Sequence, residues 1–156
     1  MIDVSLKMSE KNKKYEKWKR LNKTIVFTNG CFDLLHQGHI DLLFKASSYG
    51  DKLVVGINSD ESVRKLKGPN RPVENEKIRK KKLMKFKFVD EVYIFHDLTP
   101  LKLIKSICPN ILIKGDDYAI SEIVGGDFVI NLGGKVITIP LTPGYSTTLS
   151  IKKLNK

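Results

Sequence analysis

Short apolar runs that do not alternate with polar residues constrain the fold of this chain most strongly. They lie at residues 24–28 (TIVFT), 52–58 (KLVVGIN), 91–95 (EVYIF), 111–114 (ILIK) and 135–140 (KVITIP). A strand without a polar face is buried on both sides, which is typical of parallel sheets covered by helices. Segments of helical period separate the runs. The sequence therefore predicts a Rossmann-like α/β fold, a five-stranded parallel sheet with helices on both faces.

The intervening segments carry helix start and stop signals. We expect helices over residues 9–21, 39–49, 61–66, 74–88, 100–107, 121–132 and 146–154. Ser9 and Asp60 are the predicted N-caps of the first and third helices, Gly50 ends the second, and Pro100 suits a first helical position. In open sheets of this kind ligands bind beyond the carboxyl ends of the strands, where the strand order reverses. Functional residues should therefore follow the first, fourth and fifth strands.

Length and composition fit one domain. The chain has 156 residues, of which 41% are hydrophobic and 29% charged, so it is large enough to bury a core. We divide it into an N-terminal helical extension, 1–22, and a domain over 23–156. It has no apolar run of transmembrane length and no recognisable secretory signal. Cys31 and Cys108 lack metal-binding or redox spacing, so we expect two free thiols and a cytoplasmic location.

The net charge of +11 raises the alternative of nucleic-acid binding. However, 24 of the 28 basic residues are lysines, whereas bidentate contacts to phosphates and base edges favour arginine. The lysines concentrate at 7–20, 77–87 and 152–156, where they are interpreted as solvated faces and tails that also attract small anions. A basic nucleic-acid-binding module, with salt-dependent affinity, stays open as the alternative of a different class.

One turn combines the features of a phosphate site. Residues 29–39 (NGCFDLLHQGH) directly follow the first predicted strand. Gly30 lets backbone amides approach a ligand, and the helix that begins near His39 presents unpaired N–H groups and its positive dipole end. His36 and His39 flank Gly38, which leaves room between the imidazoles for a bulky group. We predict that they bind phosphate. The alternatives are ordinary turn histidines or a zinc site, which needs further ligands.

The pattern Gly-x-Phe-Asp-x-x-His-x-Gly-His at 30–39 resembles the fingerprint of the cytidylyltransferase-like nucleotidyltransferases, which share His-x-Gly-His with class I aminoacyl-tRNA synthetases. The motifs 58–60 (NSD), 66–73 (LKGPNRPV), 114–118 (KGDDY) and 146–148 (STT) resemble the adenylyltransferase domain of bacterial heptose kinase/adenylyltransferases. The resemblance covers roughly residues 22–154. It implies that a nucleoside monophosphate passes from an NTP, with ATP favoured over CTP, to D-glycero-β-D-manno-heptose 1-phosphate. The products would be pyrophosphate and ADP-heptose, a precursor of lipopolysaccharide.

The resemblance also implies roles for individual residues. His36, His39 and Lys67 would be catalytic, with the imidazoles stabilising charge at the α-phosphorus and Lys67 reaching the α-phosphate or the acceptor phosphate. Arg71 would join Lys67 on the acceptor phosphate, and Asp33 would orient the loop. The implied nucleotide-binding residues are Thr28, Asn29, Gly30, Cys31, Phe32, Asp33, Gly38, Arg79, Gly115, Asp116, Asp117, Tyr118, Ser146, Thr147 and Thr148.

The chemistry implied here requires no general base. A phosphate monoester has its second pKa near ~6 and is mostly dianionic at neutral pH, so in-line attack needs alignment and charge neutralisation. Mg²⁺ is the expected cofactor, held by triphosphate oxygens and water, and we predict no metal site built from protein ligands. The expected partners are the NTP and a phosphorylated small molecule, with no nucleic acid and no membrane. The resemblance adds a homodimer.

Two departures from the heptose pattern keep the base and the acceptor open. Residues 114–118 read Lys-Gly-Asp-Asp-Tyr where the heptose enzymes usually have Lys-Gly-Gly-Asp-Tyr, and the extra acid resembles the Gly-Asp-Asp-Trp of glycerol-3-phosphate and choline-phosphate cytidylyltransferases. Those enzymes carry an arginine at the start of the last motif, which residues 141–147 lack. The alternative function is a CTP-dependent cytidylyltransferase acting on glycerol 3-phosphate or a similar alcohol phosphate. Chain length and motif order exclude a tRNA synthetase.

Overall fold

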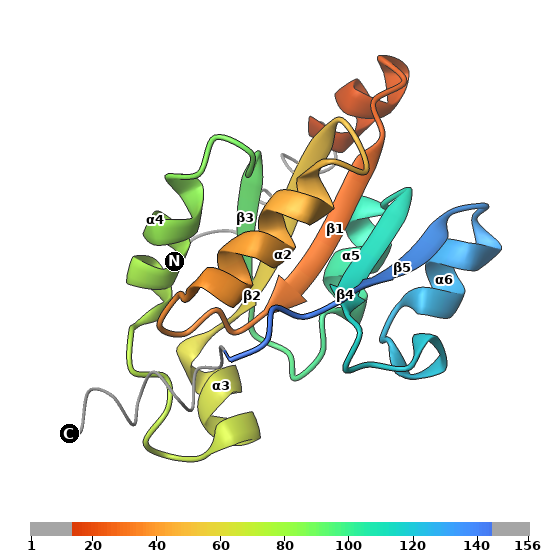
Figure 1. The fold of residues 1–156 in the computed structure, drawn as a ribbon. Helices are drawn as coiled ribbons and strands as arrows, with labels where there is room; N and C mark the ends of the chain where they lie inside the picture. Colours follow the sequence, from red (N-terminus) through yellow and green to blue (C-terminus); the bar gives the residue numbers. More distant parts are fainter. Residues whose placement is uncertain (1–13, 145–156) are drawn as a thin grey trace, which may run out of the picture.

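Five parallel strands form the centre of the structure, a computed structural model that describes residues 14–144 (Figure 1). Within that range the strands run in the order β3-β2-β1-β4-β5, and every neighbouring pair is parallel. Their bounds are β1 (Ile25–Gly30), β2 (Lys52–Asn58), β3 (Glu91–Phe95), β4 (Ile111–Gly115) and β5 (Lys135–Ile139). The predicted Rossmann-like sheet is confirmed, and its order reverses between β1 and β4.

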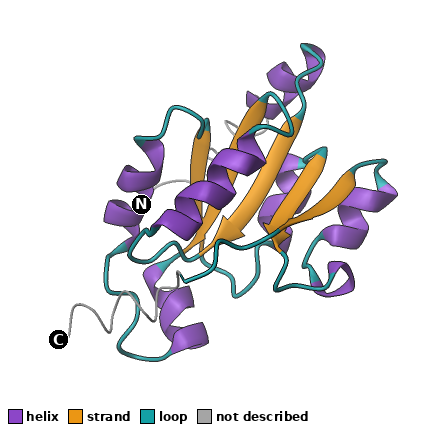
Figure 2. Cartoon of the chain, viewed as in Figure 1, coloured by secondary structure: helices purple, strands orange, loops and turns teal. Residues whose placement is uncertain are grey.

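Helices cover both faces of the sheet, as predicted (Figure 2). One face carries α2 (Gln37–Ser47) and α4 (Glu76–Met84). The other face carries the helical segment 14–20, α5 (Leu101–Ile107), η1 (Ile120–Glu122) and α6 (Gly126–Asn131). The remaining helix, α3 (Asp60–Lys67), lies beyond the carboxyl end of β2. None of the helices in the described part of the chain is long and apolar enough to cross a membrane.

Successive strand residues pack into two separate cores, because side chains alternate between the faces of a strand. Ile25 and Phe27 belong to the core under α5 and α6, whereas Val26 belongs to the core under α2 and α4. Tyr15 and Trp18 are buried in the first of these cores. The proposed boundary at residue 22 stays a prediction, but the described part of the N-terminal helix packs against the same sheet.

Several helix boundaries differ from the prediction. Ser59, and not Asp60, caps α3 by accepting a hydrogen bond from Ser62 N–H. The helix expected over 74–88 is shorter because Asn75 caps α4. Pro100 is the N-cap of α5 and not its first residue. The expected helix 121–132 is split into η1 and α6, because Gly125 adopts a φ of 84°, outside the helical range. Ser9 and the closing helix 146–154 lie outside the described residues.

The sheet opens where its order reverses. Six residue pairs join β1 to β2 and five join β4 to β5, but only Val26–Ile111 and Phe27–Leu112 join β1 to β4. The next contact across this junction comes from a side chain, because the Thr28 hydroxyl donates a 2.7 Å hydrogen bond to the Ile113 carbonyl. Thr28 is completely buried. The expectation that it binds nucleotide is therefore wrong, since its hydroxyl links two strands.

We expect Thr28→Val to lower the free energy of unfolding by about 1–2 kcal/mol, because it leaves the buried Ile113 carbonyl without this donor. Urea denaturation measures the loss, and Thr28→Ser, which keeps the hydroxyl, is the matched control. Equal stability of the valine and serine variants would show that the bridge contributes nothing.

Candidate active site

His36 and His39 cap the start of α2 reciprocally. The backbone N–H of His39 donates to Nδ1 of His36, and the backbone N–H of His36 donates to Nδ1 of His39, both at 3.3 Å. This is a capping box built from two imidazoles, and it satisfies N–H groups that a helix start otherwise leaves open. The sequence spacing of three residues is what allows the exchange, since each side chain reaches the other's backbone.

The two imidazole rings stack on one another. Their centroids are 3.7 Å apart and their planes are inclined by 16°. The expectation that Gly38 leaves room between them for a bulky group is therefore wrong, because the rings are already in contact. Gly38 lies inside the first turn of α2, and the Phe32 ring packs edge-on against His39 with a centroid distance of 5.3 Å. A ligand cannot enter between the rings.

Both imidazoles are neutral at pH 7. Burial lowers the pKa of His36, and burial, aided by the neighbouring His36 and Lys67, lowers that of His39 to about 3. Because Nδ1 of each ring accepts a backbone N–H, the single proton of each neutral ring is on Nε2. The pair thus presents two neutral N–H donors, which suit phosphoryl oxygens that gain charge during a reaction.

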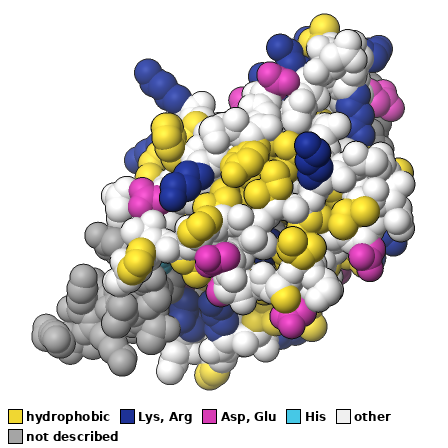
Figure 3. All heavy atoms as spheres, turned by 45° about the vertical axis from the view of Figure 1, so that its right-hand side comes forward, with side chains coloured by type: hydrophobic (Ala, Val, Ile, Leu, Met, Phe, Trp, Pro, Cys, Tyr) yellow, Lys and Arg dark blue, Asp and Glu magenta, His cyan; other side chains and the backbone are white. Residues whose placement is uncertain are grey.

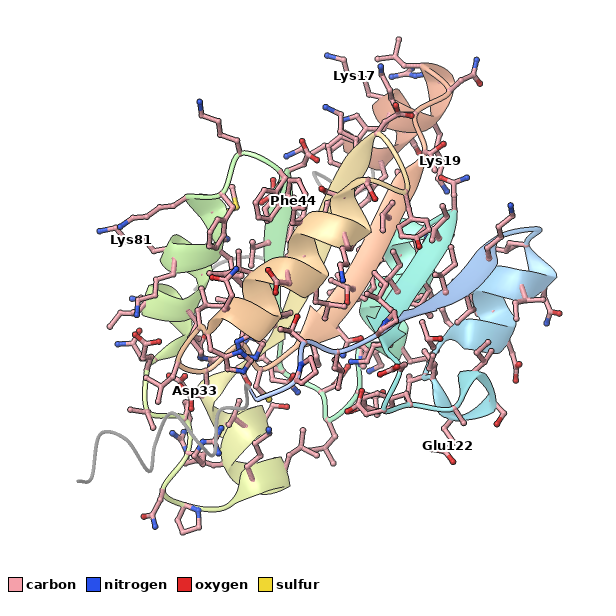
Figure 4. The ribbon with its side chains drawn as sticks, viewed as in Figure 1. Lys17, Lys19, Asp33, Phe44, Lys81 and Glu122 are labelled. Carbon is pink, nitrogen blue, oxygen red and sulfur yellow. The ribbon has the colours of Figure 1, made fainter. Side chains whose placement is uncertain are left out.

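Asp33 anchors the loop after β1 to the segment before α4 (Figure 4). Its buried carboxylate accepts hydrogen bonds from Val73 N–H at 2.8 Å and Glu74 N–H at 3.0 Å, and from Nε of Arg71 at 3.1 Å. The structure gives Asp33 the loop-orienting position expected from the resemblance. Arg71, expected on the acceptor phosphate, has its Nε committed to Asp33, and its side chain is only 15% exposed.

Arg79 joins four segments at the same end of the sheet. Its guanidinium donates to the carbonyls of Cys31, Asn58 and Glu74 and to the carboxylate of Asp60, at 2.7–2.9 Å. The residue is fully buried. The prediction that it contacts phosphate is corrected, since the residue is buried and four of the five N–H donors of its guanidinium are directed at protein acceptors. Its role is to hold the ends of β1 and β2 against α3 and α4.

A cleft of about 370 Å³ opens beyond the carboxyl ends of β1 and β4. Lysine and arginine side chains gather low on the molecule in Figure 3, at this end of the strands. The predicted residues among those that line the cleft are the last two of β1, the residue that follows it, one from α3 and one after β4. The lining residues are Asn29, Gly30, Cys31, Asn58, Leu66, Lys67, Leu98, Thr99, Pro100, Lys114, Tyr118, Glu122, Ile123 and Val124.

Lys67 connects this cleft with the imidazole pair. It lines the cleft and is exposed, and it is close enough to His39 and to Cys31 to shift the pKa of both. The Cys31 thiol lies 3.7 Å from Oδ1 of Asn58, and burial raises its pKa, so it stays protonated and unreactive. Both cysteines are free thiols, as predicted.

The predicted residues 115–118, at the end of β4 and just after it, make different contacts. Gly115 packs against Leu141, and Asp116 accepts a hydrogen bond from Leu141 N–H, so these two residues fix the chain that leaves β5. Asp117 is exposed and close enough to influence Lys114, and Tyr118 lines the cleft. Ser146, Thr147 and Thr148 lie outside the described residues. Within residues 14–144, no three His, Cys, Asp or Glu side chains are grouped so as to hold a metal ion.

Lys114 was not among the predicted site residues, although its motif was. It is the penultimate residue of β4, and its Nζ donates a 2.9 Å hydrogen bond to the carbonyl of Asn29. Its alternation within β4 could have indicated that it lies on the same face of the sheet as Leu112, two residues earlier. On the opposite side, the apolar cleft wall contributed by Leu98, Pro100 and Ile123 carries no sequence signal, because it forms only when loops after β3 and β4 meet.

A family model described as cytidylyltransferase-like matches residues 27–153. The chain is 50% identical over 140 residues to the bifunctional protein HldE of Paramagnetospirillum magneticum, covering 90% of this chain and 29% of that protein. It is 51% identical over 137 residues to HldE of Koribacter versatilis, covering 88% and 28%. The chain thus spans about three tenths of the length of these relatives.

Among solved structures, a lipopolysaccharide core biosynthesis protein from Thermoplasma volcanium has the same fold, with a TM-score of 0.63 and 28% identity. The match covers 77% of this chain and 97% of that one. The comparisons with both sequence and structure confirm the predicted resemblance.

The stacked pair predicts acid sensitivity. The pKa of His39 falls from 6.5 to about 3 on folding, so below pH 6.5 the unfolded chain binds a proton that the folded chain does not, and stability is lost as the pH falls. We expect His39→Asn, whose amide can keep the Nδ1 contact, to reduce this loss between pH 7.5 and 5.0 by on the order of 2 kcal/mol. Urea denaturation at both pH values tests it. His96→Asn, which removes an exposed histidine, should behave as wild type, and an unchanged pH dependence in His39→Asn contradicts the prediction.

Proposed function

This chain belongs to the cytidylyltransferase-like family, and on that premise we propose that it transfers the adenylyl group of ATP to a sugar 1-phosphate, with release of pyrophosphate. The proposed acceptor is D-glycero-β-D-manno-heptose 1-phosphate, and the product is ADP-heptose. One observation carries the proposal: two neutral Nε2–H donors at the start of α2 stand beside a cleft that contains Lys67 and Lys114. Neutral donors and separate cations suit a reaction in which charge shifts among phosphoryl oxygens.

The proposed reaction is a direct displacement. An oxygen of the acceptor phosphate forms a bond to the α-phosphorus, and the bond from that phosphorus to the oxygen bridging to the β-phosphorus breaks. The electron pair leaves with pyrophosphate. The dianionic acceptor needs no base, so the protein aligns it and neutralises its charge. His36 and His39 donate to oxygens of the α-phosphoryl group, and Lys67 lies between the two substrates.

Mg²⁺ accompanies the triphosphate in this proposal. We assign it to phosphate oxygens and water, the ligands that this ion commonly keeps, and to no set of carboxylates of this chain. It supplies charge neutralisation for the leaving pyrophosphate.

The preference for ATP over CTP and the assembly into a homodimer are further parts of the proposal. Sedimentation equilibrium tests the dimer, and the assay below tests the nucleotide.

We expect a screen of pyrophosphate release to identify ATP with heptose 1-phosphate as the fastest pair. ATP, CTP, GTP and UTP are each combined with heptose 1-phosphate, glycerol 3-phosphate and choline phosphate in the presence of Mg²⁺. Faster release with CTP and glycerol 3-phosphate would replace the proposal by the cytidylyltransferase alternative. If no pair releases pyrophosphate and the protein binds DNA or RNA in a salt-dependent way, the nucleic-acid-binding module is favoured.

Substitution of either imidazole should abolish most of the turnover while the fold remains. His36→Asn and His39→Asn can each keep an acceptor near the Nδ1 position for the cap, but they remove the Nε2–H donor. We expect kcat to fall by about 10²–10³-fold, the cost of losing one transition-state donor, with a change in stability of about 1 kcal/mol or less at pH 7.5. Steady-state kinetics and thermal unfolding measure the two effects. Near-wild-type kcat in either variant refutes the assignment.

A further inference from the structure

The junction of β1 and β4 is bridged by side chains where its backbone ladder ends. Beyond Phe27 and Leu112 the strands separate, and two bonds span the gap. The Thr28 hydroxyl bonds to the Ile113 carbonyl, and one residue further along the Lys114 ammonium bonds to the Asn29 carbonyl. Thr28 is sealed in the core, but Lys114 reaches the cleft. The second bridge therefore places a positive charge at the point where the sheet opens.

The Lys114 ammonium has more N–H donors than hydrogen bonds within the described residues. Within residues 14–144 it makes one hydrogen bond, to Asn29, and its Nζ lies 4.7 Å from the centroid of the Tyr118 ring. An ammonium has three N–H donors, and a desolvated charge is costly unless it is paired. Burial lowers its pKa, and the carboxylate that opposes this effect, Asp117, is exposed. An anion in the cleft would complete its coordination.

Two lysines and one carboxylate line the cleft. Lys114 lines it from β4 and Lys67 from the end of α3, on either side of the loop that follows β1. The exposed Glu122 is the lining carboxylate, and the side chains of Leu66, Leu98 and Val124 are apolar. The two lysines outweigh the single carboxylate, so an anionic group entering this space is attracted to them. Two monovalent cations match the charge of a phosphate monoester dianion at neutral pH.

Lys114 and Lys67 have different surroundings, which suit them to different substrates. Lys67 influences the pKa of His39, whereas the charges that influence Lys114 belong to Asp117 and Cys31. Neither His36 nor His39 lines the cleft. An α-phosphoryl group at the imidazole edges would thus be reached by Lys67, whereas Lys114, bonded to Asn29 at the β1–β4 opening, is left for the attacking substrate.

We propose that Lys114 binds the phosphate group of the acceptor, and that its bond to Asn29 fixes the position of its ammonium at the β1–β4 opening. The inference rests on the proposed function and extends it by naming the residue that recognises the acceptor's phosphate. Lys67 is shared by both phosphates, and Lys114 contacts the acceptor alone. Tyr118 keeps the ammonium in place through its ring face.

Direct binding tests the proposal without turnover. Isothermal titration measures the affinity of heptose 1-phosphate, glycerol 3-phosphate, inorganic phosphate and a non-hydrolysable ATP analogue for wild type, Lys114→Met and Lys114→Gln. We expect both variants to lose about tenfold or more in affinity for whichever phosphate acceptor the wild type binds, because a charged hydrogen bond is removed. Affinity for the ATP analogue should stay within about twofold, and the acceptor KM should rise with the ATP KM unchanged.

Two comparison variants separate binding from scaffolding. Lys135→Met removes the same charge at the amino end of β5, where the residue is exposed, and should keep wild-type affinity for every ligand. Thr28→Val removes the other bridge across the junction without changing charge, and it should lower stability but keep acceptor affinity. Lys114→Gln can still donate to the Asn29 carbonyl, so it provides a variant without the charge in case Lys114→Met fails to fold.

Several results would overturn the inference. Wild-type acceptor affinity in Lys114→Gln would show that the ammonium only supports the strands. An equal loss in Thr28→Val would assign the effect to strand spacing, and a parallel loss for the ATP analogue would place Lys114 on the nucleotide. A wild-type protein that binds none of the three phosphate acceptors would also refute it. In contrast, the expected binding losses without pyrophosphate release from any NTP would leave Lys114 as a phosphate ligand and refute the proposed function.

Discussion

The buried guanidinium of Arg79 is the interaction on which the reactive end of the sheet depends. It donates to the carbonyls of Cys31 and Asn58, at the ends of two neighbouring strands, and to the carboxylate of Asp60 at the start of α3. Loops that follow parallel strands have no ladder of their own, so something else must set their relative positions. A planar, permanently charged group with several fixed donor directions does this, and loss of one partner of such a buried network leaves the others without compensation.

At the end of the sheet that Arg79 holds together, the neutral donors and the full charges belong to different residues. The imidazoles of His36 and His39 are kept neutral by burial and offer donors without full charges. The full charges belong to Lys67 and Lys114, which line the adjacent cleft. In the proposed reaction, a neutral donor beside the reacting phosphorus would bind the triphosphate only moderately before the reaction, so that the gain in binding comes in the transition state. The lysines can then attract the second anion despite its repulsion from the first.

The sequence predicted the sheet well because its signals are local. The apolar runs of β2 and β3 end at the observed residues, Lys52–Asn58 and Glu91–Phe95. Site residues adjoining β1 were also found, because glycine and histidine directly after a strand are informative by position. Arg79 was misjudged because it stands among lysines in α4, and its burial depends on carbonyls 21 and 48 residues away. The stacking of the imidazoles depends on side-chain torsions, which residue spacing does not specify.

The exchange of backbone contacts between His36 and His39 makes the two rings a single cooperative unit. Each Nδ1 accepts the amide of the other residue, so the choice of tautomer at one position is enforced through the backbone of its neighbour. Energetic contributions of the two side chains therefore cannot be added as if they were independent. Replacement of one ring would leave the backbone N–H that fixes the proton of the other, and would remove only the stacked ring face against which the survivor packs.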